Sequence, residues 1–143
     1  MKAAVVLFTR DLRVHDNPAL AAAAEAAETV LPLFVLDEAI GRTRYGAAAN
    51  WRAFLLESLA DLHASLRALG GALDVRRGDV VAETVRAARE AGAVTVFASA
   101  DVSPYARERE RRLGAALDVQ SYPAPIVDHA EAVARFREQR DLQ

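Results

Sequence analysis

Short hydrophobic runs rich in valine, leucine and phenylalanine recur along the chain, separated by longer amphipathic segments. Runs that are apolar at consecutive positions are typical of strands covered on both faces, as in parallel sheets. The pattern therefore predicts buried strands at Ala3–Phe8, Val30–Leu36, Leu73–Arg76, Val94–Ser99 and Val119–Tyr122.

The segments between these runs repeat their hydrophobic positions with helical spacing. Asn17 is suited to cap the first segment, and Gly70 with Gly71 is suited to end the second. We expect helices from Pro18 to about Ala27, from Trp51 to Leu69, from Asp79 to Ala91 and from Pro104 to about Leu117, with a further amphipathic helix over residues 129–143.

Strands and helices alternate along the chain with short connections, which favours a parallel sheet with helices on both faces. Right-handed crossovers make this an α/β fold with a doubly wound, five-stranded parallel sheet in a three-layer α/β/α, Rossmann-like sandwich. In such folds ligands bind beyond the carboxyl ends of the strands, where the strand order reverses. The loops at that edge are expected at Thr9–Asp16, Asp37–Ala47, Gly78–Asp79 and Ala100–Pro104.

Composition narrows the class of protein. The 143 residues fit one domain, and 52% hydrophobic with 27% charged residues is ordinary for a globular chain. A net charge of −2 gives no general sign of nucleic acid or an anionic membrane as partner. The lack of cysteine excludes disulfides and thiolate chemistry. With no long apolar run and no signal peptide, we expect a cytoplasmic protein without a membrane partner.

Common ligand-binding and catalytic signatures are missing. The sequence has no G-x-G-x-x-G after the first predicted strand, no G-x-x-x-x-G-K-[ST] and no G-x-S-x-G. Common dinucleotide sites, P-loops and hydrolase nucleophiles are therefore not indicated. His15, His63 and His129 do not have the spacing of metal ligands. We expect neither a metal site nor catalytic residues in this chain.

Charged residues gather in the segment TRDLRVHDNPAL, between the first predicted strand and the first helix. In one interpretation, Arg10 and its charged neighbours pair within the loop, Arg13 with Asp11 or Asp16, while Asn17 caps the helix. In the other, the charges serve a partner surface. The residues alone leave both interpretations open.

A second charged segment, SADVSPYARERERRL, follows the fourth predicted strand. Glu108 and Arg112 have the i, i+4 spacing of a solvated helix pair, which is the ordinary interpretation for Arg111 and Arg112. Asp101, Tyr105 and Arg109 differ, because a ligand at the carboxyl edge would meet them first.

Three segments resemble the DNA photolyase/cryptochrome family. FTRDLRVHDNPAL is similar to its opening signature, FLLESLADLHASLRALGGAL followed by RGD resembles the second helix and third strand of its N-terminal domain, and ADVSPYARERE resembles the segment after its fourth strand. The resemblance covers residues 3 to 120 and implies an α/β antenna domain at 1–128. The segment 129–143 is atypical for the family.

The resemblance implies a function in light harvesting. Family members hold an antenna chromophore in this domain and pass absorbed energy to FAD in a helical domain, which binds damaged DNA and repairs pyrimidine dimers. That helical domain, the expected partner, is absent from these 143 residues. We therefore expect the chain alone to lack photolyase activity, and we expect damaged DNA to be bound only through the partner.

The resemblance also indicates the antenna type. Folate-type members have Asn-Glu where this chain has Tyr105 and Ala106, whereas DVSPYARERE is closer to members with a hydroxylated deazaflavin. Trp51 stands where those relatives tend to have arginine, so the adjacent Arg52 is the candidate there. The expected cofactor-binding set consists of polar anchors at Asp101 and Arg109, backbone and wall contacts from the segment FVLD, and two further positions: Phe34, Val35, Leu36, Asp37, Arg52, Asp101, Tyr105 and Arg109.

Two other functions remain as alternatives. A nucleotide-binding domain similar to the universal stress proteins would need a glycine-rich phosphate loop late in the chain, and VTVFASADVSPYA contains no glycine. A domain with a vestigial site that only docks to a partner would need no ligand residues at all.

Overall fold

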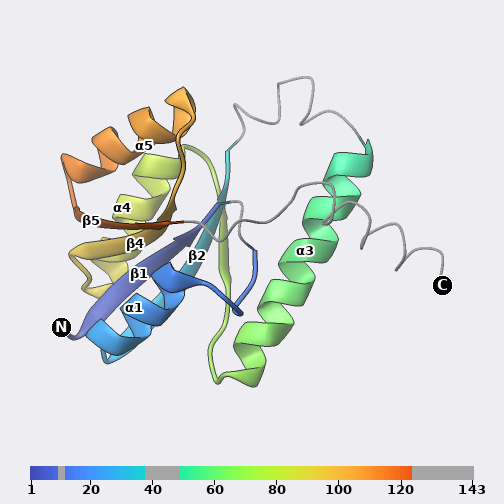
Figure 1. The fold of residues 1–143 in the computed structure, drawn as a ribbon, viewed down its shortest axis with the longest axis horizontal. Coiled ribbons are helices and arrows are strands. Elements are labelled where there is room, and N and C mark those ends of the chain that lie inside the picture. The colour runs from blue at the N-terminus through green and yellow to red at the C-terminus, as the bar shows by residue number, and fades with distance from the viewer. Residues whose placement is uncertain (10–11, 38–48, 124–143) are drawn as a thin grey trace.

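A computed structural model of the chain describes residues 1–9, 12–37 and 49–123. Along the chain, its elements are β1 (Ala3–Phe8), α1 (Pro18–Ala26), β2 (Thr29–Leu36), α3 (Ala49–Ala68), β3 (Asp74–Arg77), α4 (Val80–Ala91), β4 (Thr95–Ala100), α5 (Pro104–Gly114) and β5 (Asp118–Pro123) (Figure 1). The five predicted strands and the helices predicted in these ranges are confirmed. The predicted boundary at residue 128 and the helix at 129–143 lie outside the described residues.

The strands form one parallel sheet in the order β3-β2-β1-β4-β5. From the central β1, the chain first adds β2 and β3 on one side and then β4 and β5 on the other. The order therefore reverses between β1 and β4, which is the switch point where ligands bind in doubly wound sheets. The predicted fold class is confirmed.

The two faces of the sheet carry different side chains. On one face, aliphatic residues such as Val5, Leu33 and Val96 pack against α4 and α5. On the other face, aromatic residues pack against α1 and α3, among them Phe34 and Phe97. Alternate residues of a strand point to opposite faces, so neighbours in the sequence enter different cores.

The ends of α4 and α5 depend on specific residues. Gly78, at φ +135°, turns the chain after β3, and Asp79 caps α4 by accepting the Ala82 N–H at 2.9 Å. Helix α5 ends at Gly114, earlier than the predicted end near Leu117. Glycine is a poor helix former, and the turn after it returns Leu117 to the core around α4 and α5.

Asn17 caps α1, as predicted, and also holds the loop before it. The Asn17 Oδ1 accepts the Leu20 N–H at 3.1 Å, and its Nδ2 donates to the Arg13 carbonyl at 3.0 Å. Asp16 is exposed at φ +48°, and among the described residues it makes no ion pair with an arginine. The predicted pair of Asp16 with Arg13 is therefore not formed, because the left-handed turn leaves Asp16 exposed. Arg10 and Asp11 lie outside the described residues.

None of the helices in the described ranges is both long enough and apolar enough to span a bilayer.

Candidate ligand site at the carboxyl edge of the sheet

The carboxyl edge brings together loops that are distant in the sequence. Asp37 directly follows β2, Asp79 precedes α4, and Asp101 follows β4 just before α5. Asp37 and Asp101 lie on either side of the end of β1, because β1 separates β2 from β4 in the sheet. Side chains that join these loops therefore cross the switch point.

Tyr105, in the first turn of α5, makes one such crossing. Its hydroxyl donates to the Asp37 carboxylate at 2.5 Å, and the guanidinium of Arg109 lies 5.8 Å from the centre of its ring. Partial burial, followed by the bond to Asp37, raises the Tyr105 pKa to about 12. Tyr105 is thus a neutral hydrogen-bond donor with 46% of its surface still exposed.

A second crossing joins α4 to α5. Both Nη atoms of Arg112 donate to the Asp79 carboxylate, at 3.2 and 3.1 Å. These bonds, together with the Ala82 N–H, hold the pKa of Asp79 below its ordinary value. The predicted Glu108–Arg112 pair is wrong, because Arg112 points across to α4 and Glu108 pairs with Arg111 at i, i+3.

Tyr105, Arg109 and Arg112 have the spacing i, i+4 and i+7 and form one stripe along α5. Together with Asp37, Asp79 and other residues of α4 and α5, this stripe lines an open depression of about 70 Å³. A ligand pocket usually measures about 300–1,000 Å³. The depression alone is too small to enclose a ligand, so the described residues provide one polar wall of the candidate site. The chemistry of this wall suits a flat ring with hydrogen-bonding groups.

Asp101 lies beside this wall. Its Oδ1 accepts the Ser103 N–H at 3.1 Å, which shapes the turn into α5. Asp101 and Arg109 also line a smaller depression of about 10 Å³ against β4 and β5, enough space for one water molecule. The structure thus brings Asp37, Tyr105 and Arg109 together and places Asp101 next to them.

The other predicted residues occupy different surroundings. Phe34 and Val35 are buried in the two cores, on opposite faces of the sheet, and Leu36 packs partly against the aromatic core. None of these three residues lines either depression. Arg52 is exposed in the first turn of α3, on the face opposite α5, so the structure does not group it with Tyr105 and Arg109.

Sequence reasoning did not select Asp79 or Arg112 as site residues. The sequence places Asp79 in an edge loop, and an aspartate directly before a helix indicates a cap rather than a ligand site. The available signal was the stripe on α5, because a residue seven positions after Tyr105 lies on the same face.

Across residues 1–9, 12–37 and 49–123, no three histidine, aspartate or glutamate side chains gather closely enough to hold a metal ion.

Known proteins are similar to this chain in both sequence and fold. The model of the family described as DNA photolyase matches residues 4–138. The chain is 52% identical over 117 residues to the deoxyribodipyrimidine photo-lyase of Streptomyces griseus, covering 82% of this chain and 26% of that protein. The chain thus spans about a quarter of the length of this relative.

Solved structures give the same result. A bacterial class III photolyase from Agrobacterium tumefaciens superposes with a TM-score of 0.73 at 31% identity, covering 85% of this chain and 26% of that one. An archaeal photolyase from Sulfolobus tokodaii, solved with two FAD molecules and discussed for a novel light-harvesting cofactor, has a TM-score of 0.72. It covers 93% of this chain and 34% of that one, and at 20% identity it shows the fold alone.

Matching segments, a family match over nearly the whole sequence and a shared sheet topology lead to one conclusion. The chain belongs to the DNA photolyase family and is the N-terminal α/β domain found in its photolyases and cryptochromes.

Proposed function

We propose that this domain binds a flat antenna chromophore of the hydroxylated deazaflavin type at the carboxyl edge of its sheet. The observation that carries the proposal is the convergence of Asp37, Tyr105 and Arg109 at the switch point, where α/β sheets bind ligands. The archaeal relative discussed for a light-harvesting cofactor has the same fold, which is consistent with such a role.

Each residue has a distinct role in this proposal. Arg109 and Asp101 provide charged hydrogen bonds that fix the orientation of the ring, and the exposed part of Tyr105 provides a surface on which it stacks. The backbone of Phe34–Asp37 forms the adjoining wall. Fixed orientation matters for an antenna, because the cofactor performs the photochemistry while the protein supplies position and environment.

In a longer photolyase or cryptochrome, the chromophore would transfer absorbed energy to FAD in a helical domain, where dimers in damaged DNA are repaired. Arg52 stays a candidate contact from the other side of the edge. A cytoplasmic location also belongs to this proposal.

Melting curves with and without a hydroxylated deazaflavin test the proposal, because a ligand that binds the native state raises the melting temperature. We expect stabilisation by the deazaflavin and none by a reduced folate. Asp101→Asn and Arg109→Ala should each weaken binding by about 1–3 kcal/mol, the range for hydrogen bonds to charged groups.

Arg111→Ala is the matched control, since Arg111 pairs with Glu108 and is absent from the wall. Equal affinity in the wild type and in both site variants would remove the proposed site. Absence of any deazaflavin binding would leave the alternative of a domain that only docks to a partner.

A further inference from the structure

The usual place for a phosphate in this fold is the N-terminus of a helix that follows a strand, where free N–H groups point at the anion. In each of α1, α4 and α5, one of these groups is already bonded to a side chain of the chain itself. Asn17, Asp79 and Ser103 accept the N–H groups of Leu20, Ala82 and Ala106, at 3.1, 2.9 and 3.1 Å respectively.

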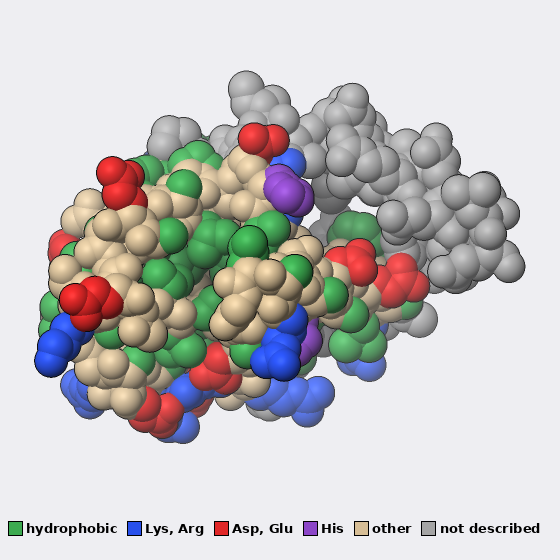
Figure 2. All heavy atoms as spheres, turned by 90° about the horizontal axis from the view of Figure 1, so that it is seen from below, with side chains coloured by type: hydrophobic (Ala, Val, Ile, Leu, Met, Phe, Trp, Pro, Cys, Tyr) green, Lys and Arg blue, Asp and Glu red, His purple; other side chains and the backbone are tan. Residues whose placement is uncertain are grey.

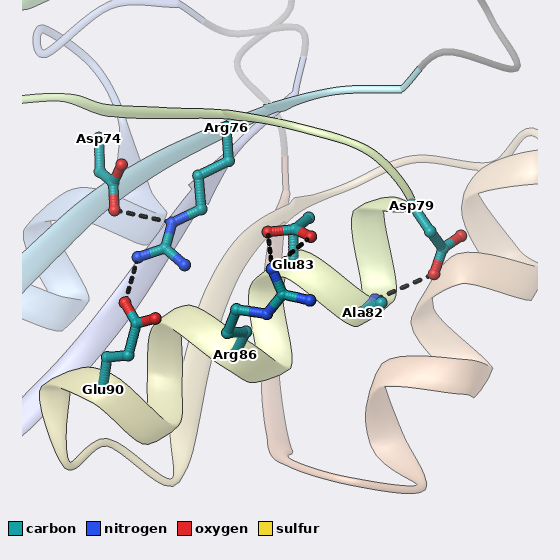
Figure 3. Close-up of polar contacts among 7 residues, drawn as sticks. All are labelled: Asp74, Arg76, Asp79, Ala82, Glu83, Arg86 and Glu90. Carbon is teal, nitrogen blue, oxygen red and sulfur yellow. Dashed lines mark hydrogen bonds and ion pairs between the residues drawn. The ribbon is translucent and has the colours of Figure 1, made fainter.

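At two of these helix N-termini, a proline further reduces the number of N–H groups that a phosphate can bind. Pro18 and Pro104 stand at the start of α1 and α5, so each of these helices lacks one N–H group at its first turn. The N-terminus of α4 has no proline, but its cap is a carboxylate (Figure 3). A negative charge at this position repels a phosphate, and the bonds from Arg112 favour the ionised form of Asp79.

The arginines beside the depression are engaged as well. Arg112 uses both Nη atoms on Asp79, and Arg109 lies over the Tyr105 ring. The lining residues include the carboxylates of Asp37, Asp79 and Glu108 with the guanidiniums of Arg109 and Arg112, so acidic groups outnumber basic ones. A phosphate would therefore have to displace the Asp79 carboxylate to gain Arg112.

We propose that the carboxyl-edge site selects an uncharged, hydroxylated ring ligand over its phosphate ester, with Asp79 as the specificity-determining residue. This inference rests on the proposed function, because it names the chemical class of ligand that the same site accepts. Asp79 acts in two ways, since its charge occupies the N-terminus of α4 and its bonds keep Arg112 from a ligand phosphate.

Riboflavin and flavin mononucleotide are the probe pair, since they share ring and side chain and differ by one phosphate. Fluorescence titration at constant ionic strength should show the wild-type protein binding riboflavin about tenfold more tightly, a difference of roughly 1.4 kcal/mol. Asp79→Ser keeps a capping oxygen but removes the charge. This variant should bring the two affinities together by strengthening the binding of flavin mononucleotide.

Asp118→Ser is the matched control, because it removes an exposed aspartate at the start of β5, at the amino edge of the sheet. It should preserve the wild-type preference. Wild-type protein that binds flavin mononucleotide as tightly as riboflavin would overturn the inference while leaving the ring site intact. An unchanged preference in Asp79→Ser would also overturn it.

Inorganic phosphate separates this inference from the proposed function. If neither flavin binds, the proposed ring site fails, and melting curves with phosphate alone decide the inference. Stabilisation of Asp79→Ser but not of the wild type would support Asp79 as the group that excludes phosphate. Equal stabilisation of both proteins, or of neither, would refute it.

Discussion

The two faces of the sheet are held together by different chemistry. On the α4/α5 face, an aliphatic core is bordered by ion pairs, and every ion pair between described residues lies on β3, α4, α5 or the residue before α4. Figure 3 shows Arg76 of β3 between Asp74 and Glu90, which joins the edge strand to α4. The α1/α3 face instead has an aromatic core and the neutral, buried cap Asn17.

The residues of the helices differ between the two faces in the same way. In α1, Ala19 and Ala23 are fully buried, and their small side chains allow the helix to approach the phenylalanines of the sheet. Viewed from below, Figure 2 shows hydrophobic side chains across the middle of the molecule and charged ones mainly toward its margin. The polar wall of the candidate site belongs to the α4/α5 face. Apolar packing therefore stabilises the α1/α3 face. The α4/α5 face also carries charged groups that a ligand can contact.

The largest expected effect is on the aromatic face. Phe97 is 3% exposed and stacks on Tyr122, with ring centres 6.1 Å apart. Phe97→Ala should lower the free energy of unfolding by about 3–5 kcal/mol, through lost burial and the remaining cavity. Val96→Ala, one residue earlier on the opposite face, should cost about 2 kcal/mol, since it removes two carbon atoms rather than a whole ring. Urea unfolding of both variants measures the difference.

Phe97→Leu serves as the control, because it keeps most of the side-chain volume and should recover much of the loss. Equal costs for Phe97→Ala and Val96→Ala would show that the aromatic core contributes no more than the aliphatic one.

An intermediate effect is expected at the α1 cap. Asn17→Ala removes both the bond to the Leu20 N–H and the bond to the Arg13 carbonyl, and should cost about 1–2 kcal/mol. Since both bonds are neutral, the loss should be the same at low and high salt. Asp16→Asn is the control, because asparagine also tolerates a positive φ, and it should change stability by less than about 0.5 kcal/mol. A large loss from Asp16→Asn would support the interpretation in which Asp16 pairs with Arg10.

Most of the fold could be predicted because strand burial and helix caps are local signals. The run Ala3–Phe8 matches β1 at both ends, and Asn17, Pro18, Asp79 and Gly92 mark helix ends by their own conformational preferences. The end of α5 was less accurate, because alanines after Gly114 extend the helical pattern beyond the point where the chain turns.

The site was harder to predict, because its contacts join loops that are distant in the sequence. Spacing alone suggested Glu108 as the partner of Arg112, but Asp79, 33 positions away, provides two hydrogen-bond acceptors. Likewise, nothing local pairs Asp37 with Tyr105 across 68 positions. Edge loops can be identified from sequence, but their side-chain partners depend on strand order and helix rotation.

The smallest expected effect concerns pH on the α4/α5 face. The Tyr105 pKa is about 12 in the folded chain, against an ordinary value of 10.0. Below pH 10, folded and unfolded chains both keep the phenolic proton, and the stabilisation is fully present. As pH rises from there through about 12, the unfolded chain releases the proton first, so this stabilisation is lost. Tyr105→Phe lacks the hydroxyl and does not undergo this loss. The difference in free energy of unfolding between the wild type and Tyr105→Phe should therefore shrink over this pH interval.

Because Tyr105 is nearly half exposed, solvent screening keeps this effect small, and it requires a matched comparison. Asp37→Ala should lower the pKa of the phenol, measured as ultraviolet absorbance of phenolate in the wild type minus that in Tyr105→Phe. Asp37→Asn keeps an oxygen that can accept a hydrogen bond from the hydroxyl. Its phenol pKa should therefore lie between that of the wild type and that of Asp37→Ala. Parallel loss of stability in wild type and Tyr105→Phe would mean that the bond to Asp37 does not brace the edge. Of the two contacts that cross this edge, the Arg112–Asp79 pair would then be the one that holds the polar wall.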